Sequence, residues 1–152
     1  MYKKLALIAL ASTLFAGCAT TPMESIEKTT LAQEFNSPSE GNSGLYIYRS
    51  GTFAGGLKKK VWVNGKCIGQ TAPNVFFYEE VEGDREYNIS TQSEFSPNDL
   101  LIKVKSGMLY FIRQYMKIGV FSAGADIELV DELEGKKAVK NLKMAKEGMC
   151  IE

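Results

Sequence analysis

A cysteine at the end of a short apolar run has the clearest chemistry in this sequence. Cys18 is preceded by two lysines near the N-terminus, an apolar stretch over residues 5–15 and two small residues. The stretch is too short to span a bilayer, which takes ~20 apolar residues, and its flanks are typical of a removed export signal. Bacteria attach a diacylglyceryl group to a thiol in this position and then cleave before it. We therefore predict that residues 1–17 are removed and that Cys18 is lipidated; the alternative is an ordinary secretory signal with an incidental cysteine.

The residue after Cys18 bears on which membrane would hold the chain. In enteric-type bacteria an Asp at this position retains lipoproteins in the inner membrane, so Ala19 favours the outer membrane. Two acyl chains anchor a protein stably without a spanning helix. The predicted partner is thus the lipid bilayer through acylated Cys18, and the predicted location is the outer membrane, facing the periplasm.

The remaining cysteines, Cys67 and Cys150, are an even pair in an oxidising compartment, which predicts a disulfide. The alternative is a redox or nucleophilic pair, but neither cysteine has a CxxC partner and the chain contains no histidine. The lack of histidine removes the commonest general base and the commonest metal ligand. We expect no catalytic residues, no metal site and no cofactor. With 18 basic and 18 acidic residues before signal removal, the charge balance also argues against nucleic acid as a partner.

A glycine-rich loop over residues 51–56 is followed by Lys58, Lys59 and Lys60. Exposed backbone N–H groups and lysines can hold an anion, but the spacing of a phosphate-binding loop is absent. The favoured interpretation is a strand connection whose lysines solvate a sheet edge. Contact with anionic lipid headgroups or lipopolysaccharide phosphates is the alternative.

Two aromatic residues lie in apolar, glycine-rich loops. If Phe53 and Phe121 lie at one end of the domain, they form an exposed apolar patch and, with the three lysines, a candidate partner surface. The sequence equally allows them to fill the core. Neighbouring carboxylates, such as Glu79 and Glu80, are interpreted as surface charge rather than as an acid–base pair.

The elements that would position these residues are short strands at roughly 10-residue spacing, the pattern of an all-β sandwich or barrel. Asn64-Gly65 predicts a type I′ hairpin turn. The fold class is therefore mainly β, an antiparallel β-sandwich of about seven or eight strands with a short C-terminal helix. The predicted strands cover residues 45–48, 60–63, 66–68, 75–78, 85–91, 100–104, 108–115 and 125–130.

The predicted signal and strands divide the chain into three parts. Residues 1–17 are the signal peptide, and residues 18–43 are the lipidated N-terminus and a polar tether that allows a short helix over 23–36. Residues 44–152 form the β-sandwich domain, with an amphipathic helix over 131–145 ahead of Cys150.

Two parts of the pattern resemble known families. Residues 61–69, with the Asn-Gly turn, resemble PEGA-type β-sandwich modules. The wider stretch over about 44–134 is similar to bacterial lipoproteins of the domain of unknown function 2846 (DUF2846), through LYIYR at 45–49, YFIRQ at 110–114 and IELVDE at 127–132. The resemblance implies a periplasm-facing β-domain on a lipid anchor and supplies no catalytic residues.

These observations predict a non-enzymatic binding or structural module of the cell envelope, with an envelope protein or a cell-wall component as its partner. Two alternatives stay open from the sequence. One is an immunity-type lipoprotein that neutralises a periplasmic toxin, and the other is a small hydrolase that depends on a carboxylate.

Overall fold

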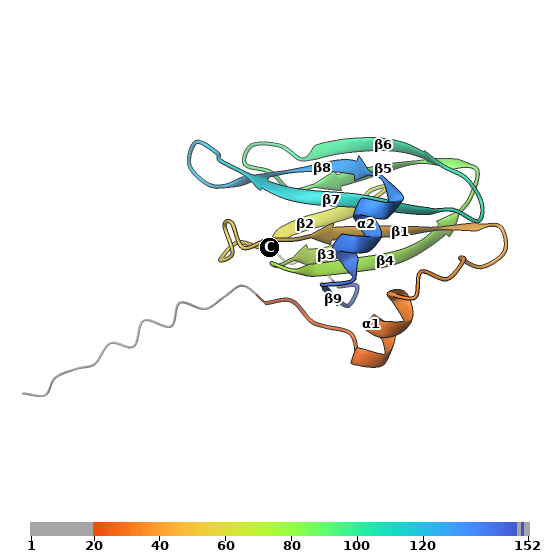
Figure 1. Cartoon of the computed structure of the whole chain (residues 1–152). Coiled ribbons are helices and arrows are strands. Elements are labelled where there is room, and N and C mark those ends of the chain that lie inside the picture. Colours follow the sequence, from red (N-terminus) through yellow and green to blue (C-terminus); the bar gives the residue numbers. More distant parts are fainter. Residues whose placement is uncertain (1–19, 149, 151–152) are drawn as a thin grey trace, which may run out of the picture.

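Two β-sheets packed face to face form the body of the protein (Figure 1). The computed structural model describes residues 20–148 and 150, so the predicted signal peptide and Cys18 lie outside the described residues. One sheet has the strand order β8-β7-β1-β4-β9 and the other β3-β2-β5-β6. The mainly β sandwich with a C-terminal helix is confirmed. The elements are α1 (Ile26–Ala32), β1 (Asn42–Arg49), β2 (Lys59–Val63), β3 (Lys66–Thr71), β4 (Val75–Glu82), β5 (Arg85–Thr91), β6 (Asn98–Val104), β7 (Leu109–Lys117), β8 (Gly124–Val130), α2 (Glu132–Val139) and β9 (Lys143–Met144).

Strand β1 is buried on both faces because the five-stranded sheet lies between the other sheet and the helices. Side chains alternate along a strand, so Leu45 and Ile47 enter the core between the sheets. Tyr46 and Tyr48 point to the outer face, where they join a second apolar cluster with Val139 and other residues. Figure 1 shows α2 lying across this outer face. The helices thus complete a three-layer arrangement around β1.

The strand pairing is mixed rather than purely antiparallel. β1 pairs parallel with β7, and β4 pairs parallel with β9, so the antiparallel prediction is wrong for these two pairs. The chain crosses to the other sheet for β2 and β3, comes back at β4, which pairs antiparallel with β1, and crosses again for β5 and β6. It then returns at β7 on the other side of β1, running in the same direction as β1. Consequently the loops that follow β1 and β7 emerge at the same end of the sandwich.

The segment predicted as a polar tether lies against the domain over the part that the structure describes. Glu24 N–H donates to Met144 O at 2.9 Å, and the Gln33 amide donates to Val139 O and Leu142 O, each at 2.8 Å. The helix within it, α1, is shorter than the range of 23–36 that the sequence allows. Ser25 begins α1 by accepting a hydrogen bond from Lys28 N–H, a normal N-cap.

The C-terminal helix is also shorter than predicted. Asp131 caps the N-terminus of α2, which ends at Val139, whereas the sequence predicted a helix over 131–145. The chain then pairs with β4, and Ala145 N–H donates to Phe76 O at 2.8 Å. Backbone pairing with an open sheet edge replaces the last helical turns, since it satisfies the same N–H groups.

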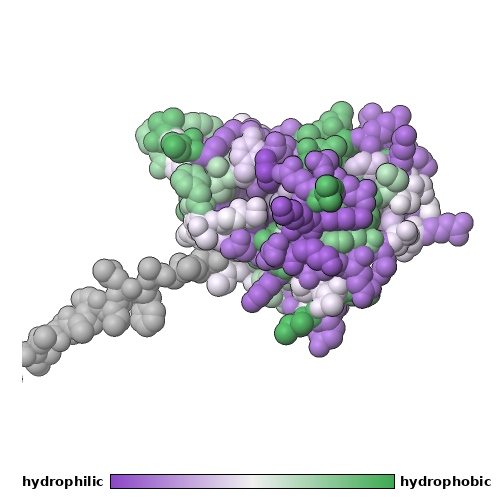
Figure 2. Space-filling model, viewed as in Figure 1, coloured by the Kyte–Doolittle hydropathy of each residue, from purple (hydrophilic) through white to green (hydrophobic). Residues whose placement is uncertain are grey.

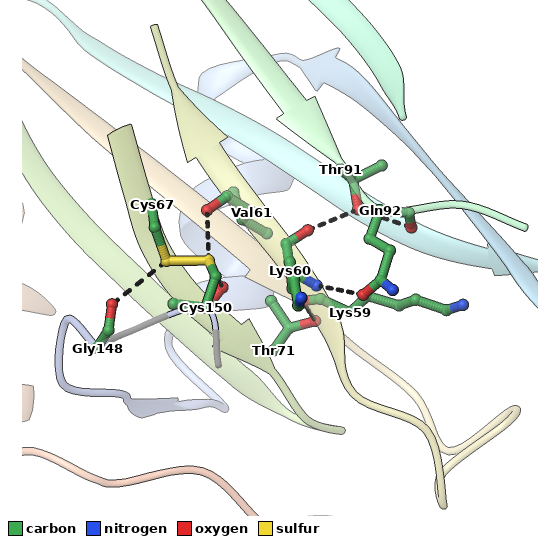
Figure 3. The surroundings of a disulfide bond; sticks show 10 residues. Lys59, Lys60, Val61, Cys67, Thr71, Thr91, Gln92, Gly148 and Cys150 are labelled. Atoms are coloured by element: carbon green, nitrogen blue, oxygen red, sulfur yellow. Dashed lines mark hydrogen bonds between the residues drawn. A yellow bond between two sulfur atoms is a disulfide. The ribbon is translucent and has the colours of Figure 1, made fainter. Parts of the chain in front are cut away.

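A disulfide joins the tail to the other sheet, as predicted. The Cα atoms of Cys67 on β3 and Cys150 lie 5.9 Å apart (Figure 3), within the usual range for a disulfide. The Asn64-Gly65 turn is confirmed as well, because both residues have positive φ, 47° and 76°, as a type I′ turn requires.

Candidate functional site: the apolar end of the sandwich

Three loops at one end of the sandwich expose apolar side chains. They are the loops over residues 50–58, 92–97 and 118–123, which follow β1, β5 and β7. In Figure 2 a green patch lies where Figure 1 places the loop between β7 and β8. We call this surface the apolar end, and define it by the exposed residues Phe53, Leu57, Phe95, Ile118, Val120 and Phe121.

The structure brings Phe53 and Phe121 to the same end, so the exposed-patch interpretation holds over the core-filling one. Their side chains are 57 % and 87 % exposed. Phe121 packs edge-on against Phe95, with ring centroids 6.3 Å apart. Phe95 was not predicted as part of this surface, although an aromatic residue in the turn-forming run Ser-Glu-Phe-Ser-Pro indicates an exposed aromatic side chain.

One carboxylate fixes the loop over 118–123. Glu94 accepts hydrogen bonds from the backbone N–H groups of Val120, Phe121 and Ser122. These N–H groups, with that of Phe121 first, hold the pKa of Glu94 below its usual range. Gly119 is required in this loop, because a Cβ there would collide with the Ser122 carbonyl oxygen and the Glu94 carboxylate. The exposed tips are therefore held in place rather than frayed.

A buried cation fixes the loop over 50–58. The Arg49 side chain is only 1 % exposed, and its guanidinium donates to the carbonyl oxygens of Leu57, Ala54 and Phe53 at 2.7, 3.0 and 3.2 Å. Burial lowers the pKa of Arg49. A planar fork with five N–H donors suits such a set of carbonyls.

The three lysines do not form one basic surface. Lys58 is exposed, Lys59 is buried and Lys60 is half-buried, because β2 begins at Lys59 and alternates its side chains between the two faces. Burial, and then the nearby Arg49 charge, lower the pKa of Lys59. Only Lys58 is placed as the edge-solvating interpretation expects.

Several cavities lie at the surface of the described chain, and two of them bear on the candidate site. A shallow one of about 210 Å³ at the apolar end is lined by Glu94, Phe95 and Ile118, among others. A larger one of about 410 Å³ lies under α1, where Leu31 and Tyr46 form part of its mostly apolar wall. In the larger cavity the Tyr78 hydroxyl donates to Glu80 at 3.2 Å, but burial, and next the Glu80 charge, raise the pKa of Tyr78 to about 12, which keeps the phenol protonated at neutral pH.

A pair of carboxylates beside the disulfide departs from the surface-charge interpretation. Glu79 is buried, with its Oε2 4.0 Å from Lys66 Nζ, and Glu147 lies 3.5 Å from the same ammonium. Burial, and next the hydrogen-bonded Glu147, raise the pKa of Glu79 to about 8. The prediction that Glu79 is a solvated charge is therefore wrong, whereas Glu80 on the opposite face is exposed. Neither Glu79 nor Glu147 lines the two cavities above.

Among residues 20–148 and 150, no group of three or more His, Cys, Asp or Glu residues could hold a metal ion. Over the same residues, no helix has the length and apolarity needed to cross a membrane.

The comparisons with known proteins identify the family. The family model described as protein of unknown function (DUF2846) matches residues 39–125. The chain belongs to the DUF2846 family. It is also 53 % identical, over 132 residues, to an uncharacterised protein of Haemophilus influenzae strain Rd, an alignment that spans 87 % of this chain and 78 % of that protein. No solved structure matches the chain significantly.

The match covers β1 to the start of β8, which includes all three loops of the apolar end. The resemblance drawn from the strand motifs is thus confirmed at the level of the family.

Proposed function

We propose that this DUF2846 protein is an outer-membrane lipoprotein, acylated at Cys18, whose β-sandwich is a non-enzymatic binding module of the cell envelope on the periplasmic side. The observation that carries the proposal is the basic, apolar and small-residue run that ends at Cys18.

The non-enzymatic part of the proposal rests on how the polar groups of the described chain are used. Buried Arg49 is bonded to loop carbonyls, and Glu94 is bonded to backbone N–H groups. Gln114 and Thr91 bond to each other between the sheets, at 2.7 Å. Each of these groups stabilises the fold, which leaves none of them free to act on a substrate.

The anchor is tested by replacing Cys18 with Ala and separating membrane from soluble fractions. The proposal expects wild type in the outer-membrane fraction, with an intact mass that includes acyl chains and lacks residues 1–17. The Cys18→Ala form should lose both the acyl mass and the mature N-terminus. As a matched control, the double variant Cys67→Ala/Cys150→Ala removes two cysteines and should keep the acyl chains. An unmodified wild-type mass would contradict the proposal.

The binding module is tested by crosslinking in cells, followed by mass spectrometry, on wild type and the Cys18→Ala form. The proposal expects an envelope protein or a cell-wall fragment that crosslinks to wild type and is lost when the anchor is removed. Crosslinks that are the same in both forms would show that any partner is reached without the membrane.

A further inference from the structure

The apolar end leaves four apolar side chains largely exposed to solvent. Ile118, Phe121, Val120 and Phe95 are 88 %, 87 %, 75 % and 75 % exposed. Single exposed apolar residues are common on protein surfaces, but a cluster of them marks a site of contact with a protein or a membrane. Here they come from neighbouring loops and stand at the extreme end of the molecule (Figure 1).

Hydrogen bonds within the fold hold the loops in the conformation that exposes these apolar side chains. Glu94 fixes the backbone at residues 120–122, and Arg49 fixes the loop that carries Phe53. A loop held by specific polar contacts, with its apolar side chains pointing outward, loses little conformational entropy when those side chains are buried. This favours a surface that is preformed for contact.

The shape of the apolar end favours a lipid surface over a peptide or a helix. The side chains project from separate loops, and the cavity between them is a shallow one of about 210 Å³, well below the size of a typical ligand pocket. Two lysines flank the tips in the chain: exposed Lys58 follows Leu57, and Lys117, whose ammonium lies 3.0 Å from Asp126, precedes Ile118. Apolar and aromatic tips with flanking lysines suit the headgroup region of a bilayer.

The start of the described chain lies toward this same end. Met23 bridges to Ala145, and Lys143 N–H donates to Asn74 O beside the first residue of β4. The side chain of Asn74 accepts a hydrogen bond from Gly51 N–H in one of the loops of the apolar end. Figure 1 shows the beginning of the described chain, in orange-red, on the side of the sandwich from which these loops emerge.

The chain between the fold and the proposed anchor is short. Cys18 precedes Thr20 by two residues, which span at most about 7 Å when fully extended. Because residues 22–24 are bonded to the domain, the acyl chains would hold this end of the sandwich against the bilayer. The sequence alone instead predicts a polar tether over residues 18–43.

We propose that the apolar end inserts its loop tips into the headgroup region of the membrane that holds Cys18, so that the sandwich stands on the bilayer with the opposite end directed away. The proposal rests on the proposed function for the position of the anchor. The loops then fix the tilt of a domain that the short connection already keeps close to the bilayer.

The test compares one small label at the two ends of the same protein. Ser122, in the apolar end, and Ser106, in the turn between β6 and β7 at the opposite end, are both exposed, so each accepts a near-isosteric change to Cys. The lipidated full-length protein carrying Ser122→Cys or Ser106→Cys is labelled with nitrobenzoxadiazole. It is then reconstituted into vesicles of phosphatidylethanolamine and phosphatidylglycerol, with or without spin-labelled lipid.

The expected result is a blue shift of the label at position 122 and its quenching by the spin-labelled lipid, neither of which the label at 106 shows. Adding Phe121→Ser and Ile118→Ser should abolish both signals at 122. These side chains are almost fully exposed, so thermal unfolding of the variant should match wild type and separate lost contact from lost fold.

Three outcomes would overturn the inference, and the first two leave the lipoprotein proposal standing. One is a lipidated protein whose labels at 122 and 106 behave alike. Another is a shift at 122 that needs no vesicles and grows with protein concentration, which would assign the apolar end to a second copy of the chain. The third is a protein that carries no acyl mass and whose Ser122→Cys label shows no shift with added vesicles. The missing acyl mass would overturn the lipoprotein proposal, and the missing shift would overturn the inference.

Discussion

Replacing Arg49 with Met tests whether one buried guanidinium holds the loop that carries Phe53. Met keeps an unbranched apolar stem but removes the charge and every donor. The Arg49 side chain is 1 % exposed and donates to three loop carbonyls at 2.7 to 3.2 Å. None of the ion pairs found among residues 20–148 and 150 includes Arg49, so these carbonyls are its described partners.

The expected change in the free energy of unfolding is the difference between the hydrogen bonds lost and the desolvation cost removed. A hydrogen bond to a charged group contributes about 1.5–3 kcal/mol, so three such bonds give about 5–9 kcal/mol. Removing the guanidinium also removes its desolvation cost, which is several kcal/mol for a buried ion. We therefore expect Arg49→Met to lower the free energy of unfolding by about 2–4 kcal/mol, since the loop carbonyls regain only part of their bonding from water.

Urea unfolding of the oxidised protein measures this difference, as a lower midpoint at an unchanged slope. Hydrogen exchange should show faster exchange of the Leu57 amide, which is bonded to Ala54 O in the same loop. The matched control is Lys58→Met, the same chemical change at an exposed cation nine residues later, and we expect it to stay within about 0.5 kcal/mol of wild type. If Arg49→Met were as stable as Lys58→Met, the guanidinium would not hold the loop and the reasoning would be refuted.

Three further changes test other parts of the fold. Cys67→Ser/Cys150→Ser should lower the free energy of unfolding in urea by about 2–4 kcal/mol, somewhat below the ~4.5 kcal/mol of the chain-entropy model for a separation of 83 residues. Glu79→Gln should stabilise the protein at pH 8 but not at pH 4, as measured by thermal unfolding across pH. The raised pKa of Glu79, about 8, means that wild type loses stability as pH rises through the range from 4.5 to 8. Gly135→Ala should lower the melting temperature by overpacking, worth about 1–3 kcal/mol, because a Cβ there would overlap the Phe111 ring, even though Ala favours a helix.

Each of these changes has a control that should behave differently. The double cysteine variant should be indifferent to reductant, and a wild type equally indifferent would contradict the bridge. Glu80→Gln should destabilise at pH 8, since hydrogen bonds from the Ser39 region lower the pKa of Glu80 and the stability that it contributes is lost as pH falls. The same sign for Glu79 and Glu80 would refute the assignment. Gly56→Ala, where a Cβ meets open space, should leave the melting temperature almost unchanged.

Local sequence patterns predicted the elements well where the determining interactions are also local. The β-rich run over residues 45–48 predicted β1. Asn64-Gly65 predicted its turn, because both residue types readily adopt the positive φ that the turn requires. The cysteine pair predicted the bridge, since an even pair of thiols in a chain predicted to be exported favours a disulfide. The helix over 131–145 was overextended, because pairing with β4 competes with the helix and involves residues far away in the sequence.

The candidate site could be predicted only in part, because long-range strand pairing brings its residues together. Phe53 and Phe121 were identifiable as apolar residues in loops, but their common location depends on the parallel pairing of β1 with β7. Lys59 looked like Lys58 in the sequence and is buried because β2 begins there. Glu79 and Glu80 looked alike as well, and only the face of β4 that each occupies gives them opposite pKa shifts.

The sequence by itself determined the family, the β-rich elements, the bridge and the proposed anchor at Cys18, because each depends on residue type and short-range spacing. Only the tertiary structure decided that residues 22–36 lie on the domain, that three loops meet at one end, and that Glu94 and Arg49 hold those loops in place. The physical reason is that hydrogen bonds and burial depend on groups brought together from distant parts of the chain. What the sequence presents as a polar tether and scattered aromatic residues is, in the described part of the folded protein, a segment bonded to the domain and an exposed apolar surface.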